Sequence, residues 1–374
     1  MDKHQKHAKL KLRDNDNFAP NEIALVGSKC DVISNLVQQI SNKLLKYKIA
    51  YFDASHNNSV VKNLLDIYTF HENGTAVTSV KIFVNKFNQR TQFSQHDLLL
   101  INGNHYQGAK QILILDKDKE ASVFKRMDQL KNIEFVIKLT DDAVLFPFFE
   151  EKMPHVKNLI CYHIDEIEKI SKHIENIIKQ KIAPIQGLVL AGGKSIRMGT
   201  DKGTLNFYGK NQRDVTVDLL EKHQLKTFLS VREDQVINFE FKITDKFVGL
   251  GPFGAICSAF QKNPDVAWLV IATDLPFVND EVIKMLLKHR NPSKIATAIK
   301  GKNNEFPEPL ITIWEPKSYT VLLNYLAQGY SCPRKVLINS DIEIIEVDTN
   351  LIRNINTPEE FKDAHKEIND NGAK

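Results

Sequence analysis

The sequence has few cysteines and no long apolar segment. Its four cysteines, Cys30, Cys161, Cys257 and Cys332, lie far apart without a Cys-x-x-Cys pair. This spacing favours neither a zinc site nor a disulfide framework, and it fits reduced thiols in the cytosol. No apolar stretch approaches the roughly 18–20 residues of a membrane span, and the polar amino terminus lacks the apolar region of a signal peptide. We therefore expect a cytoplasmic protein without a membrane anchor.

A strong excess of charge of one sign is also missing. Lys plus Arg number 50 against 46 Asp plus Glu, which leaves a formal net charge of +4. This excess is too small for a nucleic-acid coat or a polybasic membrane binder, although a local anion site remains compatible with it. We expect no nucleic acid and no membrane among the partners. With 42% hydrophobic and 26% charged residues, the composition is that of a folded globular protein.

The 374 residues predict two α/β domains, because a typical domain has roughly 150 residues. From residue 21 onward, short apolar runs alternate with longer periodic stretches, which is typical of parallel α/β sheets. A charged helix at 164–181 should end before Pro184, since a proline disfavours helical geometry in the residue before it. We therefore predict domains at 1–183 and 184–374.

Apolar runs and helical periodicity locate the elements of both domains. In the first domain, strands are predicted at 23–26, 48–52, 82–84, 98–101, 112–115 and 135–137, and helices at 31–47 and 164–181. In the second, strands are predicted at 187–190, 227–231, 267–272, 295–299, 309–313 and 343–347, and helices at 213–223, 253–262, 279–289, 316–327 and 357–368.

A glycine-rich basic loop follows the strand at 187–190. Residues 190–202 read LAGGKSIRMGTDK and contain three glycines, two lysines and one arginine. Glycines allow several backbone N–H groups to converge on one anion, and nearby cations offset the charge of a triphosphate. The pattern matches neither the P-loop nor the dinucleotide-binding motif. The sequence thus indicates a phosphate site of another kind, with a basic surface turn as the alternative.

The segment at 190–202 resembles the signature of nucleotidyltransferases, specifically molybdenum cofactor guanylyltransferases of the MobA type. Four further segments are similar to motifs of this family and occur in the family's order: GPFGA at 251–255, TDLPF at 273–277, PEPL at 307–310 and NINTPEE at 354–360. The resemblance covers residues 185 to about 368. It implies a Rossmann-like nucleotidyltransferase fold with a mostly parallel sheet for the second domain.

The resemblance also implies which residues bind the nucleotide. These are Leu190, Ala191, Gly192, Gly193, Lys202, Ser230, Asp245 and Asp274, with Lys202, Arg197 and Asp274 as the catalytic set. A carboxylate such as that of Asp245 can accept hydrogen bonds from the N1–H and N2–H₂ groups of guanine. The alternative for Asp245 is a solvated loop residue. Ser230 stands where the family often has asparagine.

Asp274 is the candidate metal ligand. It follows the apolar run at 268–272, and open α/β sheets place their sites at the carboxyl ends of parallel strands. A carboxylate beside a triphosphate implies Mg²⁺. The alternative is that Asp274 only caps the helix beginning near residue 279.

The resemblance implies that Asn354 and Asn356 lie near the metal or the pterin substrate. Arg334 is the nearest counterpart of the family's cofactor-binding arginine. Residues 357–360 also form a capping box on their own account, with Thr357 at the N-cap and Glu360 reaching back. That alternative leaves the two asparagines unexplained.

The activity implied by the resemblance is transfer of GMP from GTP to Mo-molybdopterin with release of pyrophosphate. Proteins that insert or deliver the molybdenum cofactor are the implied partners. A cytidylyltransferase of the same family, a sugar-phosphate nucleotidyltransferase and a non-catalytic nucleotide-binding scaffold are the alternatives. The pair Gly192-Gly193 favours guanine, because the cytidylyl branch tends to carry Leu-Ala-Ala-Gly there.

The first domain begins with a strand, loop and helix at 23–34, placed as a P-loop would be. Together with DLLLINGN at 97–104, it faintly resembles a degenerate MobB-type adapter GTPase. The Gly-Lys-[Ser/Thr] ending is missing, and Asp31 would put negative charge where phosphates would bind. We therefore expect no nucleotide hydrolysis here, and an α/β scaffold or docking domain is the alternative interpretation.

Overall fold

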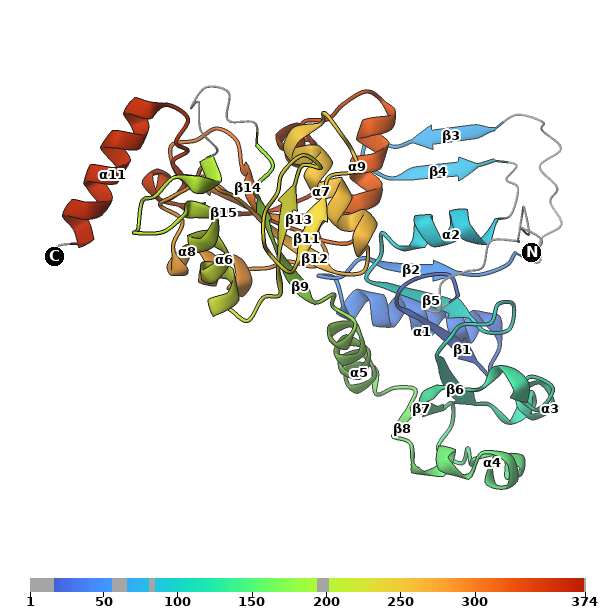
Figure 1. The fold of residues 1–374 in the computed structure, drawn as a ribbon. Helices are drawn as coiled ribbons and strands as arrows, with labels where there is room; N and C mark the ends of the chain where they lie inside the picture. The colour runs from blue at the N-terminus through green and yellow to red at the C-terminus, as the bar shows by residue number, and fades with distance from the viewer. Residues whose placement is uncertain (1–16, 56–65, 81–84, 194–201, 373–374) are drawn as a thin grey trace, which may run out of the picture. The chain divides into compact units, whose positions relative to one another are not determined.

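The computed structural model describes residues 17–55, 66–80, 85–193 and 202–372. The chain divides into two compact units, Met1–Lys181 and Ile182–Lys374, here called unit 1 and unit 2. Each unit is built around its own mainly parallel sheet with helices on both faces (Figure 1). The predicted α/β fold with mostly parallel strands is confirmed. Within the described residues, no helix has the length and apolar character needed to cross a membrane.

Unit 1 contains a parallel sheet with the strand order β2-β5-β1-β6-β7-β8. Its strands are β1 (Glu22–Val26), β2 (Ile49–Phe52), β5 (Leu98–Asn102), β6 (Gln111–Leu115), β7 (Ile133–Lys138) and β8 (Cys161–His163). A separate antiparallel hairpin consists of β3 (Ile67–Phe70) and β4 (Ala76–Ser79). The hairpin and β8 were not predicted from the sequence, and the strand predicted at 82–84 lies outside the described residues.

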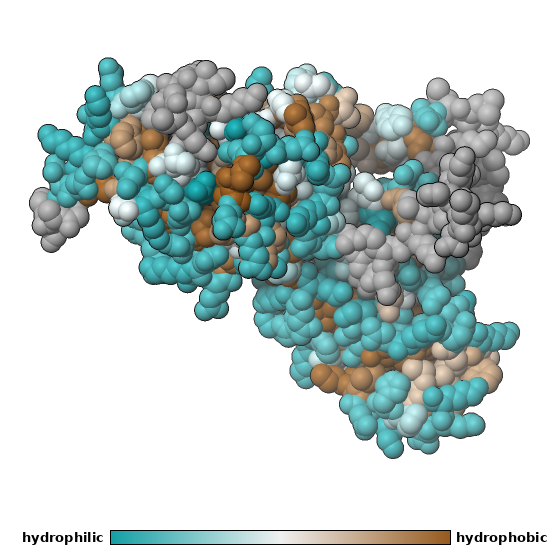
Figure 2. Space-filling model, viewed as in Figure 1, coloured by the Kyte–Doolittle hydropathy of each residue, from teal (hydrophilic) through white to brown (hydrophobic). Residues whose placement is uncertain are grey.

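Helices cover both faces of the unit 1 sheet. They are α1 (Cys30–Lys43), α2 (Lys86–Phe93), α3 (Glu120–Phe124), α4 (Pro147–Lys152) and α5 (Ile167–Gln180). Ile33 of α1 and Ile174 of α5 join the strand side chains of one core, whereas Val123 of α3 and Phe149 of α4 belong to the core on the other face. Figure 2 shows apolar atoms reaching the surface around α3 and α4, where Phe124 is 47% exposed.

The loop between β1 and α1 is fixed by packing within unit 1. Gly27 has a φ of +103°, and a Cβ atom there would lie 2.3 Å from the carbonyl oxygen of Ile114, so only glycine fits. The next residue, Ser28, is buried and donates a hydrogen bond to Asp116 Oδ2 at 2.9 Å. These contacts explain the glycine without a bound phosphate.

Unit 2 contains a seven-stranded sheet with the order β11-β10-β9-β12-β14-β13-β15. Its strands are β9 (Ile185–Leu190), β10 (Thr227–Val231), β11 (Lys242–Thr244), β12 (Ala267–Ala272), β13 (Ala296–Gly301), β14 (Glu308–Trp314) and β15 (Glu343–Val347). β14 runs antiparallel to both of its neighbours, and the other strand pairs are parallel. The short strand β11 was not predicted.

Alternating side chains of β12 separate the two cores of unit 2. Leu269 and Ile271 pack with α6 and α8 on one face, whereas Trp268 and Val270 pack with α7, α9 and α10 on the other (Figure 1). The helices are α6 (Gln212–Lys222), α7 (Gly251–Lys262), α8 (Asp280–Lys288), α9 (Ser318–Ala327), α10 (Pro333–Ile338) and α11 (Pro358–Gly372). The sequence did not predict α10, and α11 continues beyond its predicted end at residue 368.

Candidate functional site

Several of the predicted site residues of unit 2 lie at one edge of its sheet. Leu190, at the end of β9, is in register with Ser230 of β10 and with Ala272 of β12. Because these strands are parallel, the segments that follow them leave the sheet at the same edge. The loop at 191–193, Asp245 after β11 and Asp274 after β12 therefore belong to one region.

The carbonyl groups of the glycine loop are held by two side chains that follow β10. Gln235 Nε2 donates to the Ala191 oxygen at 2.9 Å, and Arg232 donates to the oxygens of Gly192 and Gly193 at 2.9 and 3.1 Å. In a trans peptide, the C=O and N–H groups point in opposite directions. The N–H groups of Gly192 and Gly193 therefore point away from Arg232 and Gln235, which leaves them oriented to bind an anion.

Asp245 is held in place by Ser230, a buried residue of β10. The Ser230 hydroxyl donates to Asp245 Oδ1 at 2.8 Å. Burial raises the pKa of Asp245, while the Ser230 hydrogen bond and the charge of Arg232 oppose the rise. A Cβ atom at Gly192 would lie 3.5 Å from Oδ2, so the glycine leaves space beside this oxygen. Asp245 is thus a partly buried, oriented carboxylate rather than a fully solvated one.

Asp274 lies beside the segment that precedes α11. Its backbone oxygen accepts a hydrogen bond from the Ile355 N–H at 2.8 Å, which brings Asn354 and Asn356 into its neighbourhood. The alternative that Asp274 caps α8 is wrong, because the Asn279 side chain caps that helix by accepting from the Val282 N–H at 3.1 Å.

Arg334 reaches the same region through Glu308. Arg334 donates to Glu308 Oε2 at 2.8 Å, and the Leu310 N–H donates to Oε1 at 3.2 Å. Glu308 is only 7% exposed. Burial raises the pKa of Glu308, the charge of Asp274 raises it further, and Arg334 opposes the rise. The charge of Asp274 therefore acts on the Glu308 carboxylate.

The donor set of this region fits a divalent cation that completes its shell with substrate oxygens. Two carboxylates that repel one another would both be stabilised by a cation between them. No group of three or more His, Cys, Asp or Glu side chains in the described ranges could hold a metal alone. Mg²⁺ bound beside phosphates often takes only one or two protein carboxylates, so Asp274 and Glu308 are the candidate ligands.

Two predicted catalytic residues cannot be located in this geometry. Arg197 lies outside the described residues, and so does the side chain of Lys202, which begins the short 3₁₀ helix η4 (Lys202–Thr204). Their roles stay predictions. Thr357 and Glu360 do form a capping box at α11, with the Glu360 N–H donating to Thr357 Oγ1 at 3.2 Å.

Comparison with known proteins decides the family of unit 2. Residues 187–342 match the model of the MobA-like NTP transferase domain. Unit 2 is a MobA-type domain.

Curated relatives agree with this assignment. A molybdenum cofactor biosynthesis bifunctional protein of Synechocystis is 34% identical over 183 residues, which are 48% of this chain and 53% of that protein. The chain therefore spans about half the length of that relative. A probable molybdenum cofactor guanylyltransferase of Natranaerobius thermophilus is 25% identical over 49% of this chain and 95% of its own length. Among solved structures, molybdopterin-guanine dinucleotide biosynthesis protein A from Archaeoglobus fulgidus has 23% identity and a TM-score of 0.43, covering 50% of this chain and 99% of that one.

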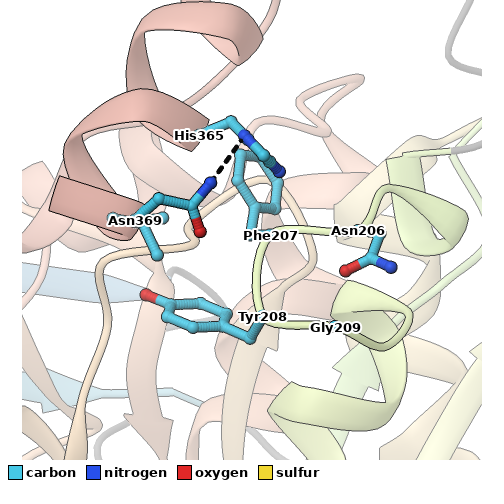
Figure 3. Close-up of a pocket in the computed structure, with 7 residues that line it drawn as sticks. Asn206, Phe207, Tyr208, Gly209, His365 and Asn369 are labelled. Atoms are coloured by element: carbon cyan, nitrogen blue, oxygen red, sulfur yellow. Dashed lines mark hydrogen bonds between the residues drawn. The ribbon is translucent and has the colours of Figure 1, made fainter. Parts of the chain in front are cut away.

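A hollow of about 680 Å³ lies between α11 and the loop after η4 in the MobA-type domain (Figure 3). Its lining consists of Asn206, Phe207, Tyr208, Gly209, His365, Ile368 and Asn369. The Tyr208 hydroxyl donates to the backbone oxygen of Pro276 at 2.8 Å, which connects the hollow to the segment after Asp274. None of the predicted site residues that the structure describes lines this hollow.

One motif glycine of the MobA-type domain is required by packing. A Cβ atom at Gly254, in α7, would lie 2.3 Å from the Phe247 backbone oxygen, whereas one at Gly193 would meet nothing within 4 Å. We expect Gly254→Ala to destabilise the domain by about 1–3 kcal/mol, because backbone must shift to accept the methyl group. Urea unfolding measures this effect. Gly193→Ala is the control, and equal stability losses in the two variants would contradict the prediction.

Proposed function

We propose that this protein is a molybdenum cofactor guanylyltransferase. In this reaction, unit 2 transfers GMP from GTP to the terminal phosphate of Mo-molybdopterin and releases pyrophosphate. The observation that carries the proposal is the convergence of the glycine loop, Asp245 and Asp274 at one edge of a MobA-type sheet. Relatives named as probable molybdenum cofactor guanylyltransferases support the choice of substrates.

The glycine loop and Asp245 bind the nucleotide in this proposal. The Gly192 and Gly193 N–H groups donate to phosphate oxygens, because Arg232 and Gln235 hold the opposite side of each peptide. Asp245 accepts from the N1–H and N2–H₂ groups of guanine, and the Ser230 hydroxyl orients it through Oδ1. Lys202 and Arg197 offset the triphosphate charge.

Asp274 and Glu308 would hold Mg²⁺, and Asn354, Asn356 and Arg334 would bind the pterin substrate. When bound, the cation would supply positive charge that offsets the phosphate charge. Arg334 is kept in place by Glu308. The attacking oxygen belongs to a phosphate monoester, which is ionised at neutral pH, so catalysis depends mainly on positioning and charge compensation. No general base is required.

We also propose a cytoplasmic location and a transfer of the product to proteins that insert or deliver the cofactor. A GTP substrate and four free cysteines agree with the cytoplasm. Unit 1 is proposed to serve as a docking or scaffold domain without nucleotide hydrolysis, since its Gly27 loop lacks the lysine and hydroxyl of a P-loop.

The proposal is tested by incubating the full chain with Mg²⁺, molybdopterin and each nucleoside triphosphate in turn while pyrophosphate is measured. We expect release with GTP to exceed release with any other nucleotide by about tenfold or more. A preference for CTP would make the protein a cytidylyltransferase. No release with any nucleotide would favour the non-catalytic scaffold.

Replacing Asp245 tests whether this residue recognises the guanine base. Asp245→Ala should lower the preference for GTP over ATP by about tenfold while affinity for the triphosphate changes less, because base-edge hydrogen bonds carry discrimination. Competition of each nucleotide against labelled GTP measures this. Asp265→Ala is the control, since this exposed residue precedes β12 and lies at the other end of the strand. A uniform loss for every nucleotide would instead assign Asp245 to the phosphates.

A further inference from the structure

Unit 1 contains a second group of reactive side chains, none of which is among the residues of the MobA-type site. Strands β2, β5 and β1 are neighbours in the parallel sheet (Figure 1). Cys30 follows β1, Asp53 follows β2 and His105 follows β5. The three side chains therefore meet at the carboxyl edge of this sheet, the place where α/β folds usually bind ligands.

Two polar side chains contact the Cys30 sulfur. Its Sγ is 3.3 Å from His105 Nε2 and 3.6 Å from Asn104 Nδ2. Cys30 is also the first residue of α1, a helix of 14 residues. A protonated imidazole and a helix N-terminus both stabilise a thiolate.

The Asp53 carboxylate lies beside the His105 ring. The Asp53 carboxylate accepts from the Tyr51 hydroxyl at 3.0 Å and from the Ala54 N–H at 2.7 Å, and its Oδ1 lies 3.6 Å from His105 Nε2. Burial and the neighbouring Asp53 raise the pKa of Tyr51, so the phenol remains a donor. His105 is 16% exposed and Asp53 29% exposed, so solvent and small solutes can reach the pair.

A buried amide lies beside this group. Asn102 is fully buried at the end of β5, its Oδ1 accepts from the Asn104 N–H at 3.1 Å, and its side chain interacts with Tyr51.

The other cysteines lack these features. Burial raises the pKa of Cys257 to about 12 and also raises the pKa of Cys161. Cys332 is exposed at the N-cap of α10, a helix of six residues. Cys332 therefore serves as the reference for an ordinary accessible thiol.

We propose that Cys30, His105 and Asp53 form a thiol-reaction site for small disulfides. Cys30 gives its proton to His105 Nε2, and the thiolate attacks one sulfur of the disulfide. The S–S bond of the reagent breaks, its second sulfur leaves as a thiolate, and Cys30 retains the first half as a mixed disulfide. His105 takes part in the proton transfer, and Asp53 is a positioning residue that acts through it.

The test uses 5,5′-dithiobis(2-nitrobenzoate), a small disulfide with carboxylates, and follows the release of its coloured thiolate. In the full chain with Cys161→Ser and Cys332→Ser, the release measures the reaction of Cys30, because Cys257 is buried. In the full chain with Cys30→Ser and Cys161→Ser, it measures the reaction of Cys332. At pH 7 we expect Cys30 to react about tenfold faster than Cys332 despite its lower exposure. Equal rates, or a slower Cys30, would overturn the proposal.

The pH profile of the same reaction tests the two partners. The ionisable groups around the sulfur are His105, Asp53 and Tyr51, together with the chain neighbours Lys29 and Asp31 and with Arg126, which donates to the Asn104 oxygen. As the pH is lowered, we expect the reaction rate of Cys30 to drop to half its maximum at a lower pH than the reaction rate of Cys332. His105→Ala should move this midpoint of the Cys30 profile to the pH found for Cys332. Asp53→Asn should move the midpoint of the Cys30 profile part of the way toward that of Cys332, and Asp53→Glu should restore the wild-type midpoint.

His155→Ala, at an exposed histidine in unit 1, is the matched control and should leave the profile unchanged. Circular dichroism checks that each variant is folded. If a folded His105→Ala variant keeps the wild-type midpoint, His105 does not activate Cys30 and the site is not the one proposed.

Discussion

Asp274→Asn is expected to lower the rate of pyrophosphate release by about a thousandfold, equivalent to about 4 kcal/mol of transition-state stabilisation. The amide keeps the size of the side chain and one oxygen ligand, but it loses the charge that holds a hard cation. Half-saturation should require more Mg²⁺ for the same reason. Because Asp274 follows β12, is only half-buried and keeps its size as asparagine, the thermal midpoint should change little.

The measurement is a Mg²⁺ titration of pyrophosphate release at saturating GTP and molybdopterin. Asp265→Asn is the matched control, because it makes the same chemical change at the amino end of β12. Unchanged half-saturating Mg²⁺ and maximal rate in Asp274→Asn would show that this carboxylate is no ligand. A lowered rate with unchanged Mg²⁺ dependence would assign it to the substrate instead.

The fold was predictable where the apolar pattern is long and regular. The predicted strands at 227–231, 267–272 and 343–347 have the same bounds in the structure. β11 has three residues with one buried side chain, too few to show an alternation. The hairpin of β3 and β4 is almost wholly exposed, so its sequence shows no apolar pattern that would predict strands. The reversed direction of β14 is also invisible in hydrophobicity, which does not distinguish parallel from antiparallel pairing.

The candidate site was predictable only where a motif marks it. The motif containing Asp274 stands directly after an apolar strand, and the loop containing Gly192 is rich in glycine. Gln235 was not singled out, because its role depends on a hydrogen bond to Ala191, 44 residues away in the chain. Glu308 was noted only within the PEPL motif. Its importance comes from burial and from the charges of Arg334 and Asp274, which no sequence pattern reveals.

A fragment of residues 182–374 is expected to retain nearly all the pyrophosphate-releasing activity of the full chain, and a fragment of residues 1–181 to have none. Each unit has its own sheet and its own apolar cores, which is the condition for independent folding. The five motifs lie between residues 190 and 360. The fragment must begin at Ile182, because Arg290 donates to the Ala183 oxygen at 2.8 Å while pairing with the buried Glu315.

Both fragments are assayed with GTP, Mg²⁺ and molybdopterin, and circular dichroism confirms that each is folded. The 182–374 fragment carrying Asp274→Asn is the control, and it should be as inactive as the full-length variant. A folded but inactive 182–374 fragment would show that unit 1 contributes residues to the reaction. We interpret Gly27 as required by packing against Ile114 and not by phosphate binding. GTP hydrolysis by the 1–181 fragment would contradict this interpretation.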